Sequence, residues 1–405
     1  MSIVVTKCSP ELVGPSESGT PTGDIHISRF DEGVGSGAVS SLLVFDKPIV
    51  DPVATIRRAL SGALVQYYPV PGRHAAGAAR GEVIRCAGEG QGVLFVGAST
   101  NCAVGDVLIS TPATRHDLLV HYPEGFWCRD VDPLLLMQVT AFSCGGFVVG
   151  VSWNHVLADG AGIGQFLQAV AELAGGVSLP SIVPVRSDES VMAAHPEGIT
   201  LDDVGAAEHT KDMAFVDFTV PSSFISRVKE LCGCTVFEAV VALVWHCRAR
   251  ALPDVDPESS VSLAVACNMR GLVGAAGGYY GNCLVMDSVA ATSAEVANSD
   301  IKDVVKLIKI AKHKIQSSGE PAERRHRLGY NTLAVSSWRN IGLEVPDFGS
   351  GRPVRVIWYA PKAFTPVFVL CPPWRGNNGV NVMGYIVKKE HLDAFMQEIA
   401  AKVGT

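Results

Sequence analysis

The sequence lacks the features that mark membrane, nucleic-acid-binding or exported proteins. No apolar run approaches the length of about 20 residues that a membrane-spanning helix needs. The N-terminal MSIVVTKCSPEL has no signal-peptide core, and the C-terminal KVGT carries no peroxisomal or retention address. A formal net charge of −7 at pH 7 argues against nucleic acids and anionic membranes as main partners. We therefore expect a cytoplasmic protein that acts on small molecules.

Motifs for metals and nucleotides are also missing. The 11 cysteines are odd in number and scattered, as in a reduced cytosolic chain. Cys232 and Cys234 form one C-x-C, but no second pair stands at zinc-site spacing, so we interpret them as small buried residues. The glycine-rich stretch 160–164 lacks the strand–GxGxxG–helix pattern of a dinucleotide site, and no P-loop is present. The sequence predicts neither a metal site nor a permanently bound cofactor.

The composition is that of a folded chain, because 48% of the residues are hydrophobic and only 18% are charged. A length of 405 residues predicts two or three domains. Residues 175–215 hold several prolines, glycines and acids with little periodicity, which predicts a long surface crossover. We therefore expect an N-terminal domain over 1–180, a linker over 181–215 and a C-terminal domain over 216–405.

Hydrophobic periodicity predicts helices and strands in both halves, without the strict alternation of a parallel doubly wound sheet. The expected fold class is therefore α/β with mixed sheets. Predicted strands cover 3–8, 42–46, 134–142, 147–153, 261–267, 354–360, 366–371 and 380–387, and predicted helices begin at 51 and cover 221–232, 235–250, 299–316 and 390–403.

One short segment joins a strand pattern to a helix pattern around a histidine. Residues 147–153 alternate as a half-buried strand does, and residues 163–173 have helical spacing, so His155 lies in the turn between them. Histidine can accept and return a proton near pH 7. Asp159 either orients this imidazole or points away and pairs with a cation, and Gly160 leaves space and permits positive φ. Taken alone, an H-x-x-x-D pattern more often marks a structural histidine in a capped turn.

Longer segments are more specific than this pattern. The stretch PLLLMQVTAFSCGGFVVGVSWNHVLADG, together with DFGSG at 347–351, resembles the plant BAHD acyltransferase family. Further matching blocks are LSGALVQYYPVPGR at 60–73, TVFEAVVALVWHCRAR at 235–250 and CNMRGLVGAAGGYYGNC at 267–283. The resemblance runs from about Lys7 to the C-terminal helix, and so covers nearly the whole chain.

The resemblance implies a fold and an activity. It implies two chloramphenicol-acetyltransferase-like domains, each a mixed β-sheet with flanking helices, and an active-site channel between them. We expect a monomer, because the two halves already supply an enclosed interface. Family members transfer an acyl group from coenzyme A, a co-substrate, to an alcohol or amine. This chain is most similar to the branch that uses benzoyl or hydroxycinnamoyl donors. We expect an amine acceptor such as tryptamine or tyramine, with His155 as general base and no acyl-enzyme; O-acylation and a non-catalytic coenzyme A ester binder are the alternatives.

The resemblance also implies roles for residues around the two motifs. Arg270 is expected to pair with Asp159, which makes that pair structural, although Arg270 could instead lie on the surface. Asp347 belongs to the second motif and is a catalytic candidate by association, but chemistry gives equal weight to a turn aspartate that bonds its own backbone. Phe348, Gly349 and Gly351 shape the same loop. Ser350 replaces the usual tryptophan, which leaves the packing of this loop open.

Four residues of the C-terminal half are candidates for binding substrates. Thr235 begins a capping box whose free N–H groups could hold a coenzyme A phosphate, and Lys229 could contact the phosphates as well. A plain helix cap and an exposed lysine are the alternatives. Ser336 could donate to a developing oxyanion and Trp338 could form an aromatic wall, where the alternative is a buried tryptophan without a ligand.

Overall fold

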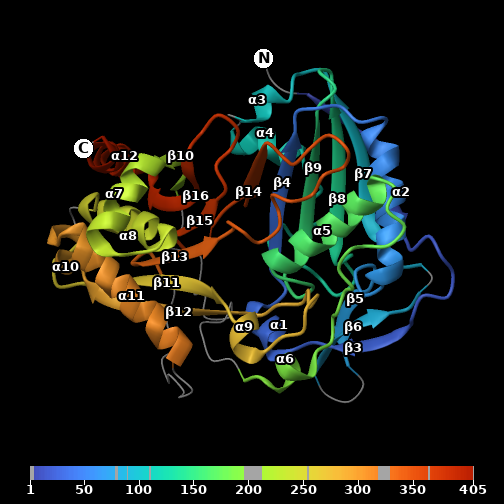
Figure 1. Ribbon diagram of the computed structural model, residues 1–405, viewed down its shortest axis with the longest axis horizontal. Helices are drawn as coiled ribbons and strands as arrows, with labels where there is room; N and C mark the ends of the chain where they lie inside the picture. The colour runs from blue at the N-terminus through green and yellow to red at the C-terminus, as the bar shows by residue number, and fades with distance from the viewer. Residues whose placement is uncertain are drawn as a thin grey trace. The chain divides into compact units, whose positions relative to one another are not determined.

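The chain forms two sheet-based units in the computed structural model, which describes residues 4–77, 81–88, 90–108, 111–195, 212–252, 255–317, 329–363 and 365–404. Contacts divide these residues between two units, drawn in Figure 1. The first comprises Met1–Pro196, Arg270–Cys283 and Asn340–Pro361; the second comprises Glu197–Met269, Leu284–Arg339 and Lys362–Thr405.

This division differs from the one expected from the sequence. Residues 270–283 and 340–361, assigned to the C-terminal domain, lie in the first unit. Residues 340–361 lie in the first unit because they contain β14 (Arg355–Tyr359), which pairs antiparallel with β4 (Ala38–Phe45). The DFGSG loop therefore belongs to the first unit. Of the expected linker 181–215, residues 196–211 lie outside the described residues.

The first unit is organised around a seven-stranded mixed sheet. The pairing order is β1-β7-β8-β9-β4-β14, with β2 added to β7. A second, three-stranded sheet has the order β3-β6-β5. The strands are β1 (Val5–Lys7), β2 (Glu11–Val13), β3 (Gly23–His26), β5 (Arg73–Ala76), β6 (Glu82–Cys86), β7 (Val93–Thr100), β8 (Leu135–Phe142) and β9 (Phe147–Asn154). The predicted hairpin of residues 134–153 is thus confirmed as β8 and β9.

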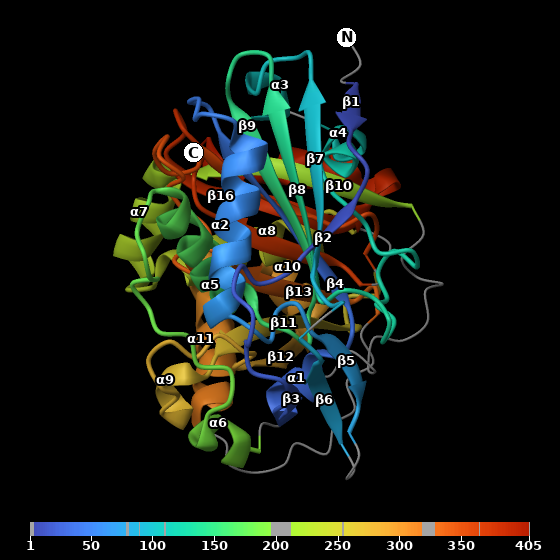
Figure 2. The same cartoon turned by 90° about the vertical axis from the view of Figure 1, so that its right-hand side faces the viewer.

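Two long helices lie side by side along this sheet, as Figures 1 and 2 show. They are α2 (Pro52–Gln66), which has proline at its first turn after the Asp51 cap, and α5 (Gly160–Ala174). The shorter helices are α1 (Arg29–Val34), α3 (Gly105–Leu108), α4 (Pro112–Asp117), α6 (Glu189–Ala193) and α9 (Arg270–Val273). In both views α1, α6 and α9 gather at one end of this unit, close to the start of α5.

The second unit has a six-stranded mixed sheet in the order β10-β16-β15-β13-β11-β12. Its strands are β10 (Met213–Pro221), β11 (Ser260–Asn268), β12 (Leu284–Thr292), β13 (Thr332–Ser337), β15 (Val367–Cys371) and β16 (Gly379–Lys388). Its helices are α7 (Ser222–Cys232), α8 (Val236–Arg250), α10 (Ser293–Asn298), α11 (Ile301–Ser317), the 3-10 turn η3 (Lys389–His391) and α12 (Leu392–Val403). Each strand and helix predicted in this half is present, with ends shifted by a few residues.

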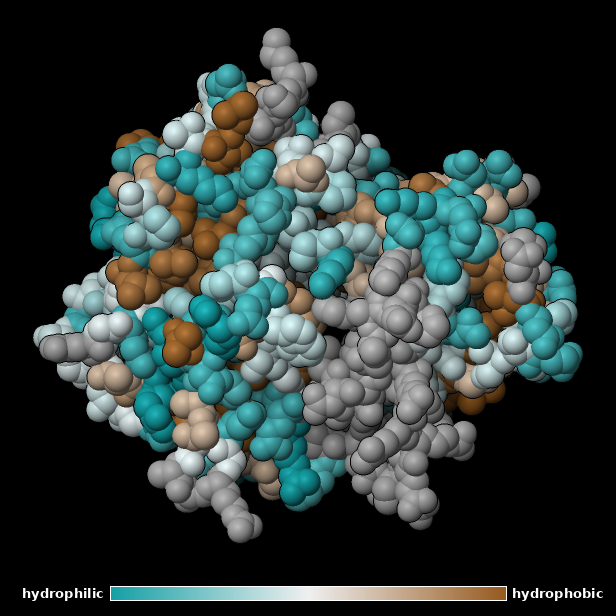
Figure 3. Space-filling model, turned by 180° about the vertical axis from the view of Figure 1, so that it is seen from behind, coloured by the Kyte–Doolittle hydropathy of each residue, from teal (hydrophilic) through white to brown (hydrophobic). Residues whose placement is uncertain are grey.

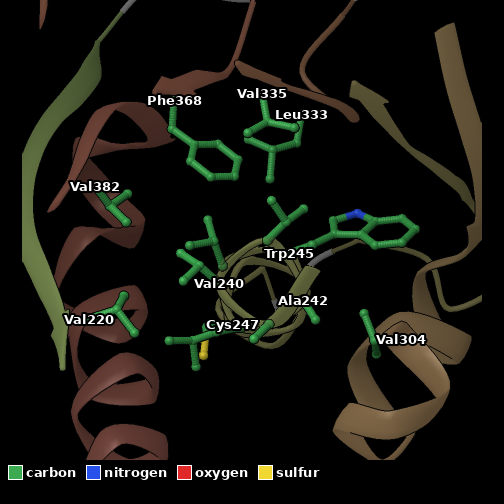
Figure 4. Packing of buried hydrophobic residues seen from close by; sticks show 14 of the residues in the cluster. Val220, Val240, Ala242, Trp245, Cys247, Val304, Leu333, Val335, Phe368 and Val382 are labelled. Atoms are coloured by element: carbon green, nitrogen blue, oxygen red, sulfur yellow. The ribbon is translucent and has the colours of Figure 1, made fainter. Parts of the chain in front are cut away.

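Helix α8 forms the centre of the second unit. Every residue from Glu238 to Ala249 is buried, as expected of a helix that is apolar on all sides. Figure 4 shows Val240 turned towards the β10 side and Trp245 turned the opposite way, with Phe368 of β15 packed above. The core of this unit is therefore a helix enclosed by a sheet and further helices.

Most large apolar side chains of the described residues are buried. On the face shown in Figure 3, hydrophobic residues form separate groups among hydrophilic ones. Within the described part of the chain, no helix combines the length and the apolar composition that crossing a bilayer requires.

Candidate active site

The turn that carries His155 is held at each end by hydrogen bonds. Strand β9 is buried along its whole length, and the His155 backbone N–H donates to the Gly37 carbonyl at 2.8 Å. The Asn154 side chain accepts from Val156 N at 3.0 Å, and the Trp153 indole donates to the Ala158 carbonyl at 2.9 Å. The histidine therefore sits on a rigid connection between a core strand and a helix, as the sequence predicted.

Helix α5 begins immediately after this turn. Asp159 is its N-cap and accepts from Gly162 N at 3.0 Å. Gly160 is the first helical residue and is not among the glycines with positive φ, so the expected left-handed conformation is wrong. Glycine is required at two later positions of this helix. A Cβ on Gly162 would stand 1.8 Å from the Tyr280 carbonyl oxygen, and a Cβ on Gly164 would stand 2.4 Å from the Ile341 carbonyl oxygen. These glycines let two later segments pack against α5.

Asp159 forms a buried ion pair with Arg270. The guanidinium donates from both terminal nitrogens, at 2.8 Å and 2.9 Å, to the two carboxylate oxygens. Cys283 N donates to the same carboxylate at 3.1 Å, and Asp159 is only 3% exposed. Including the Gly162 bond, four donors hold this carboxylate. Of the two roles considered for Asp159, pairing with a cation is confirmed.

The imidazole contacts a residue that the sequence did not single out. His155 Nδ1 lies 3.0 Å from Asn282 Oδ1. The Asn282 Nδ2 group donates to the His155 carbonyl at 2.7 Å and to Asp31 Oδ1 at 2.8 Å. Because both of these partners only accept, the amide must present its oxygen to the ring. Nδ1 then carries the proton, which leaves the Nε2 lone pair available as a base.

The surroundings of His155 favour the neutral imidazole that a base requires. Burial lowers the pKa of His155 below its ordinary value, and the nearby Asp159 and Asn282 offset this only in part. The side chain nevertheless keeps part of its surface exposed. In the described part of the chain no hydrogen bond is made to Nε2. A neutral, oriented and partly exposed imidazole can accept a proton from a bound nucleophile.

Asn282 lay within a segment that carried the family resemblance, but periodicity gives no signal for a single buried asparagine. Two further residues of this network were missed for the same reason. Asp31 is fully buried, and Arg186, which lies 3.1 Å from it, falls in the stretch expected to be a surface linker. Only the fold brings the three together.

The DFGSG loop is a tight turn in the first unit. Asp347 Oδ1 accepts from Gly349 N at 2.9 Å and from Gly351 N at 2.8 Å, and both glycines have positive φ, at 101° and 91°. Phe348 is 3% exposed and packs edge-on against Phe45. These contacts explain the presence of Asp347 as a residue that stabilises the turn.

The hydroxyl of Ser350 is buried and makes no hydrogen bond to the described residues. The family resemblance expects tryptophan at this position. The substitution therefore leaves a small polar group where a large ring is usual, beside the turn that Asp347 holds.

We expect Phe348→Ala and Asp347→Ala to show that this loop stabilises the fold and takes no part in the reaction. Removing the buried ring should lower the free energy of unfolding by about 3–5 kcal/mol, since it leaves a cavity. Asp347→Ala should cost less and leave turnover close to wild type, with Asp347→Asn as control because it keeps the accepting oxygen. Urea unfolding and turnover rates measure both effects. A hundredfold loss of rate in Asp347→Ala at unchanged stability would give Asp347 a part in the reaction.

The remaining candidates lie in the second unit. The capping box is confirmed: Thr235 Oγ1 accepts from Glu238 N at 3.2 Å, and Glu238 accepts from Thr235 N at 2.9 Å. Lys229 is exposed in the last turn of α7. Ser336 is the partly buried next-to-last residue of β13 (Thr332–Ser337), and Trp338, 6% exposed, follows the end of the strand.

Two lysines beside this cap were not predicted. Lys312 pairs with Glu238 at 2.6 Å, and Lys309 donates to the carbonyls of Cys232 and Gly233 at the end of α7. Positive charge from α11 therefore lies near the start of α8, beside the Thr235 cap, whose own N–H is bonded to Glu238.

Comparison with known proteins identifies the class. Residues 3–402 match the model of the Transferase family. Acyl transferase 15 of Oryza sativa subsp. japonica is 41% identical, with 99% of each chain covered. Myricetin 3-O-glucosyl 1,2-rhamnoside 6'-O-caffeoyltransferase AT1 of Crocosmia x crocosmiiflora is 32% identical, covering 98% of this chain and 99% of its own.

Solved structures share the fold at low identity. The crystal structure of vinorine synthase matches with a TM-score of 0.79 at 18% identity, covering 98% of each chain. That of TRI101 from F. sporotrichioides, complexed with coenzyme A and T-2, matches with a TM-score of 0.66 at 17% identity over 93% of this chain and 97% of the other. The predicted α/β fold of two domains is confirmed.

The fold and the relatives define an acyltransferase of the EC 2.3.1 class. The chain belongs to the Transferase family of plant BAHD-type enzymes, as the motifs predicted.

Proposed function

We propose that this enzyme transfers an aromatic acyl group, benzoyl or hydroxycinnamoyl, from coenzyme A to an amine such as tryptamine or tyramine. The observation that carries the proposal is the oriented imidazole: His155 Nδ1 faces Asn282 Oδ1 at 3.0 Å, so Nε2 is left as the base. The donor is supported by two relatives. One is named a caffeoyltransferase, and a structure of the same fold is titled as complexed with coenzyme A.

In the proposed reaction, Nε2 of His155 takes the proton from the acceptor amine as its nitrogen attacks the thioester carbonyl. The carbonyl π bond opens to a tetrahedral oxyanion, which nearby donors stabilise. The carbon–sulfur bond then breaks, and the thiolate leaves with the proton from His155. General base catalysis of this kind contributes about 10²–10⁴-fold in rate. The base needs no acyl-enzyme intermediate to complete the cycle.

The second unit supplies the proposed substrate contacts. Thr235 and Lys229 are proposed to bind the coenzyme A phosphates, which the neighbouring Lys309 supports with positive charge. Ser336 is proposed to donate to the oxyanion, and Trp338 to contact the aromatic acyl group. Asp159 and Arg270 are proposed to stabilise the turn that carries His155. We also propose that the enzyme is a monomer in the cytoplasm.

O-acylation of a specialised-metabolite alcohol is the second candidate. The specific observation that favours it is the name of the Crocosmia relative, which is a 6'-O-caffeoyltransferase. The same base can deprotonate a hydroxyl, so the chemistry of His155 does not separate the two acceptors.

A panel of donors and acceptors tests the proposal. The purified chain is incubated with benzoyl-CoA or coumaroyl-CoA and, separately, tryptamine, tyramine or benzyl alcohol, and products are measured by mass spectrometry. We expect acylated amine and free coenzyme A in equal amounts, formed only when the acceptor is present. Ester products alone would select O-acylation. Tight binding of the thioester without any product would identify a non-catalytic binder.

A further inference from the structure

The hydrogen bonds behind His155 lead to a carboxylate outside the H-x-x-x-D motif. Asp31 is fully buried in α1, and its two oxygens accept four hydrogen bonds and pair with one guanidinium. Oδ2 accepts from Ser28 N at 2.7 Å and from Ser28 Oγ at 2.8 Å, and it forms an ion pair with an Arg186 nitrogen 3.1 Å away. Oδ1 accepts from Asn282 N at 3.1 Å and from Asn282 Nδ2 at 2.8 Å. Arg186 thus supplies the countercharge for a buried anion that binds Asn282 twice.

Asp31 decides which end of the Asn282 amide faces the histidine. A carboxylate oxygen and a backbone carbonyl both accept and cannot donate. If the amide were turned by 180°, its oxygen would face Asp31 Oδ1 and the His155 carbonyl, and its NH₂ group would face Nδ1. Two buried acceptor pairs would then oppose one another without a proton between them, which is costly at low dielectric. The amide is held in one orientation.

Asp159 does not orient the Asn282 amide. Its carboxylate is held by Arg270 and by the N–H groups of Gly162 and Cys283. Of the two buried aspartates close to the turn, the sequence motif marks Asp159, whereas the hydrogen-bond path from the ring runs through Asn282 to Asp31.

We propose that Asp31, paired with Arg186, is a positioning residue that sets the tautomer of His155 through the Asn282 amide. With Asp31 ionised, the amide oxygen fixes the proton on Nδ1 and Nε2 is the basic nitrogen. Without Asp31, only the His155 carbonyl opposes the turned amide, so the amide can present NH₂ to Nδ1, which would move the proton to Nε2 and remove the base. The catalytic consequence rests on the proposed function, but the tautomer does not.

The first test is a double-mutant cycle on turnover. Asp31→Ala and Asn282→Ala should each lower kcat on the order of 10- to 100-fold, the range of an orienting partner. The double variant should be no slower than Asn282→Ala, because Asp31 acts through Asn282. Asp132→Ala is the matched control, since Asp132 is also buried, pairs with Arg129 and has no bond to Asn282; its kcat should stay near wild type. Multiplicative losses in the double variant would overturn the proposal.

The second test reads the tautomer directly and needs no substrate. In protein labelled with ¹⁵N-histidine, long-range proton–nitrogen spectra distinguish the protonated ring nitrogen from the bare one, and His155→Gln identifies the signals. We expect a bare Nε2 in wild type and protonated Nε2 in Asp31→Ala. A protonated Nε2 in wild type, or an unchanged ring in the variant, would refute the proposal whatever the activity panel finds.

Asp31→Ala leaves Arg186 buried without its anion and so could unfold the unit. The paired replacement Asp31→Val with Arg186→Met removes both charges and keeps apolar volume. It should fold and show the same shift of the proton to Nε2. An Nδ1-protonated ring in this folded variant would equally overturn the proposal.

Discussion

His155→Ala is expected to lower kcat by about 10²–10⁴-fold while the fold is retained. The variant loses the nitrogen that takes the acceptor proton, together with a single hydrogen bond, from Nδ1 to Asn282. Leaving Asn282 Oδ1 without that donor should cost about 1–3 kcal/mol in the free energy of unfolding. Steady-state turnover and urea unfolding measure the two effects separately.

His116→Ala is the control for this experiment. His116 also lies in the first unit, and among the described residues its side chain makes one hydrogen bond, between Nδ1 and the Tyr359 hydroxyl at 2.9 Å. It should affect stability slightly and turnover little. The general base mechanism fails if His155→Ala turns over at the wild-type rate.

Asp159→Ala should remove folded protein as well as activity. The change leaves the Arg270 guanidinium, 20% exposed, without its anion and leaves Gly162 N and Cys283 N without an acceptor. Breaking a buried ion pair by removing one partner costs about 3–5 kcal/mol. Activity should fall with it, because the segment that ends at Cys283 also carries Asn282. Urea midpoints and kcat, measured on the same preparations, give both numbers.

An exposed pair of the same geometry serves as the comparison. Arg57 donates to both oxygens of Glu11, at 2.6 Å and 2.9 Å, but the two side chains are 49% and 44% exposed. Glu11→Ala should therefore cost no more than about 1 kcal/mol. Equal losses for Asp159→Ala and Glu11→Ala would show that burial does not determine the value of the Asp159 pair.

Local sequence patterns predicted the hairpin of β8 and β9, the helices α5 and α8, and the turn that carries His155. These elements depend on periodicity and caps within a dozen residues, which a single sequence displays. The pairing of Asp159 with Arg270 came from family resemblance, since nothing local relates two residues so far apart.

The surroundings of the histidine could not be predicted in the same way. Asp31, Arg186 and Asn282 lie in three distant parts of the chain, and each would pass for a surface residue by its type. The membership of β14 in the first sheet was missed as well, because pairing with β4 depends on long-range register. Gly162 and Gly164 were considered only within a stretch that does not match a nucleotide motif, whereas in the structure they pack closely against Tyr280 and Ile341.

Residues 270–283 belong to the first unit, and this affects how halves of such enzymes can be joined in chimeras. Arg270 and Asn282 are encoded after the crossover, yet they fold around a histidine encoded before it. A chimera that joins residues 1–215 of this chain to the second half of a relative would import the arginine and asparagine of the donor. Exchanging either half therefore also exchanges residues that surround the His155 base, and the two halves of the sequence cannot be recombined independently.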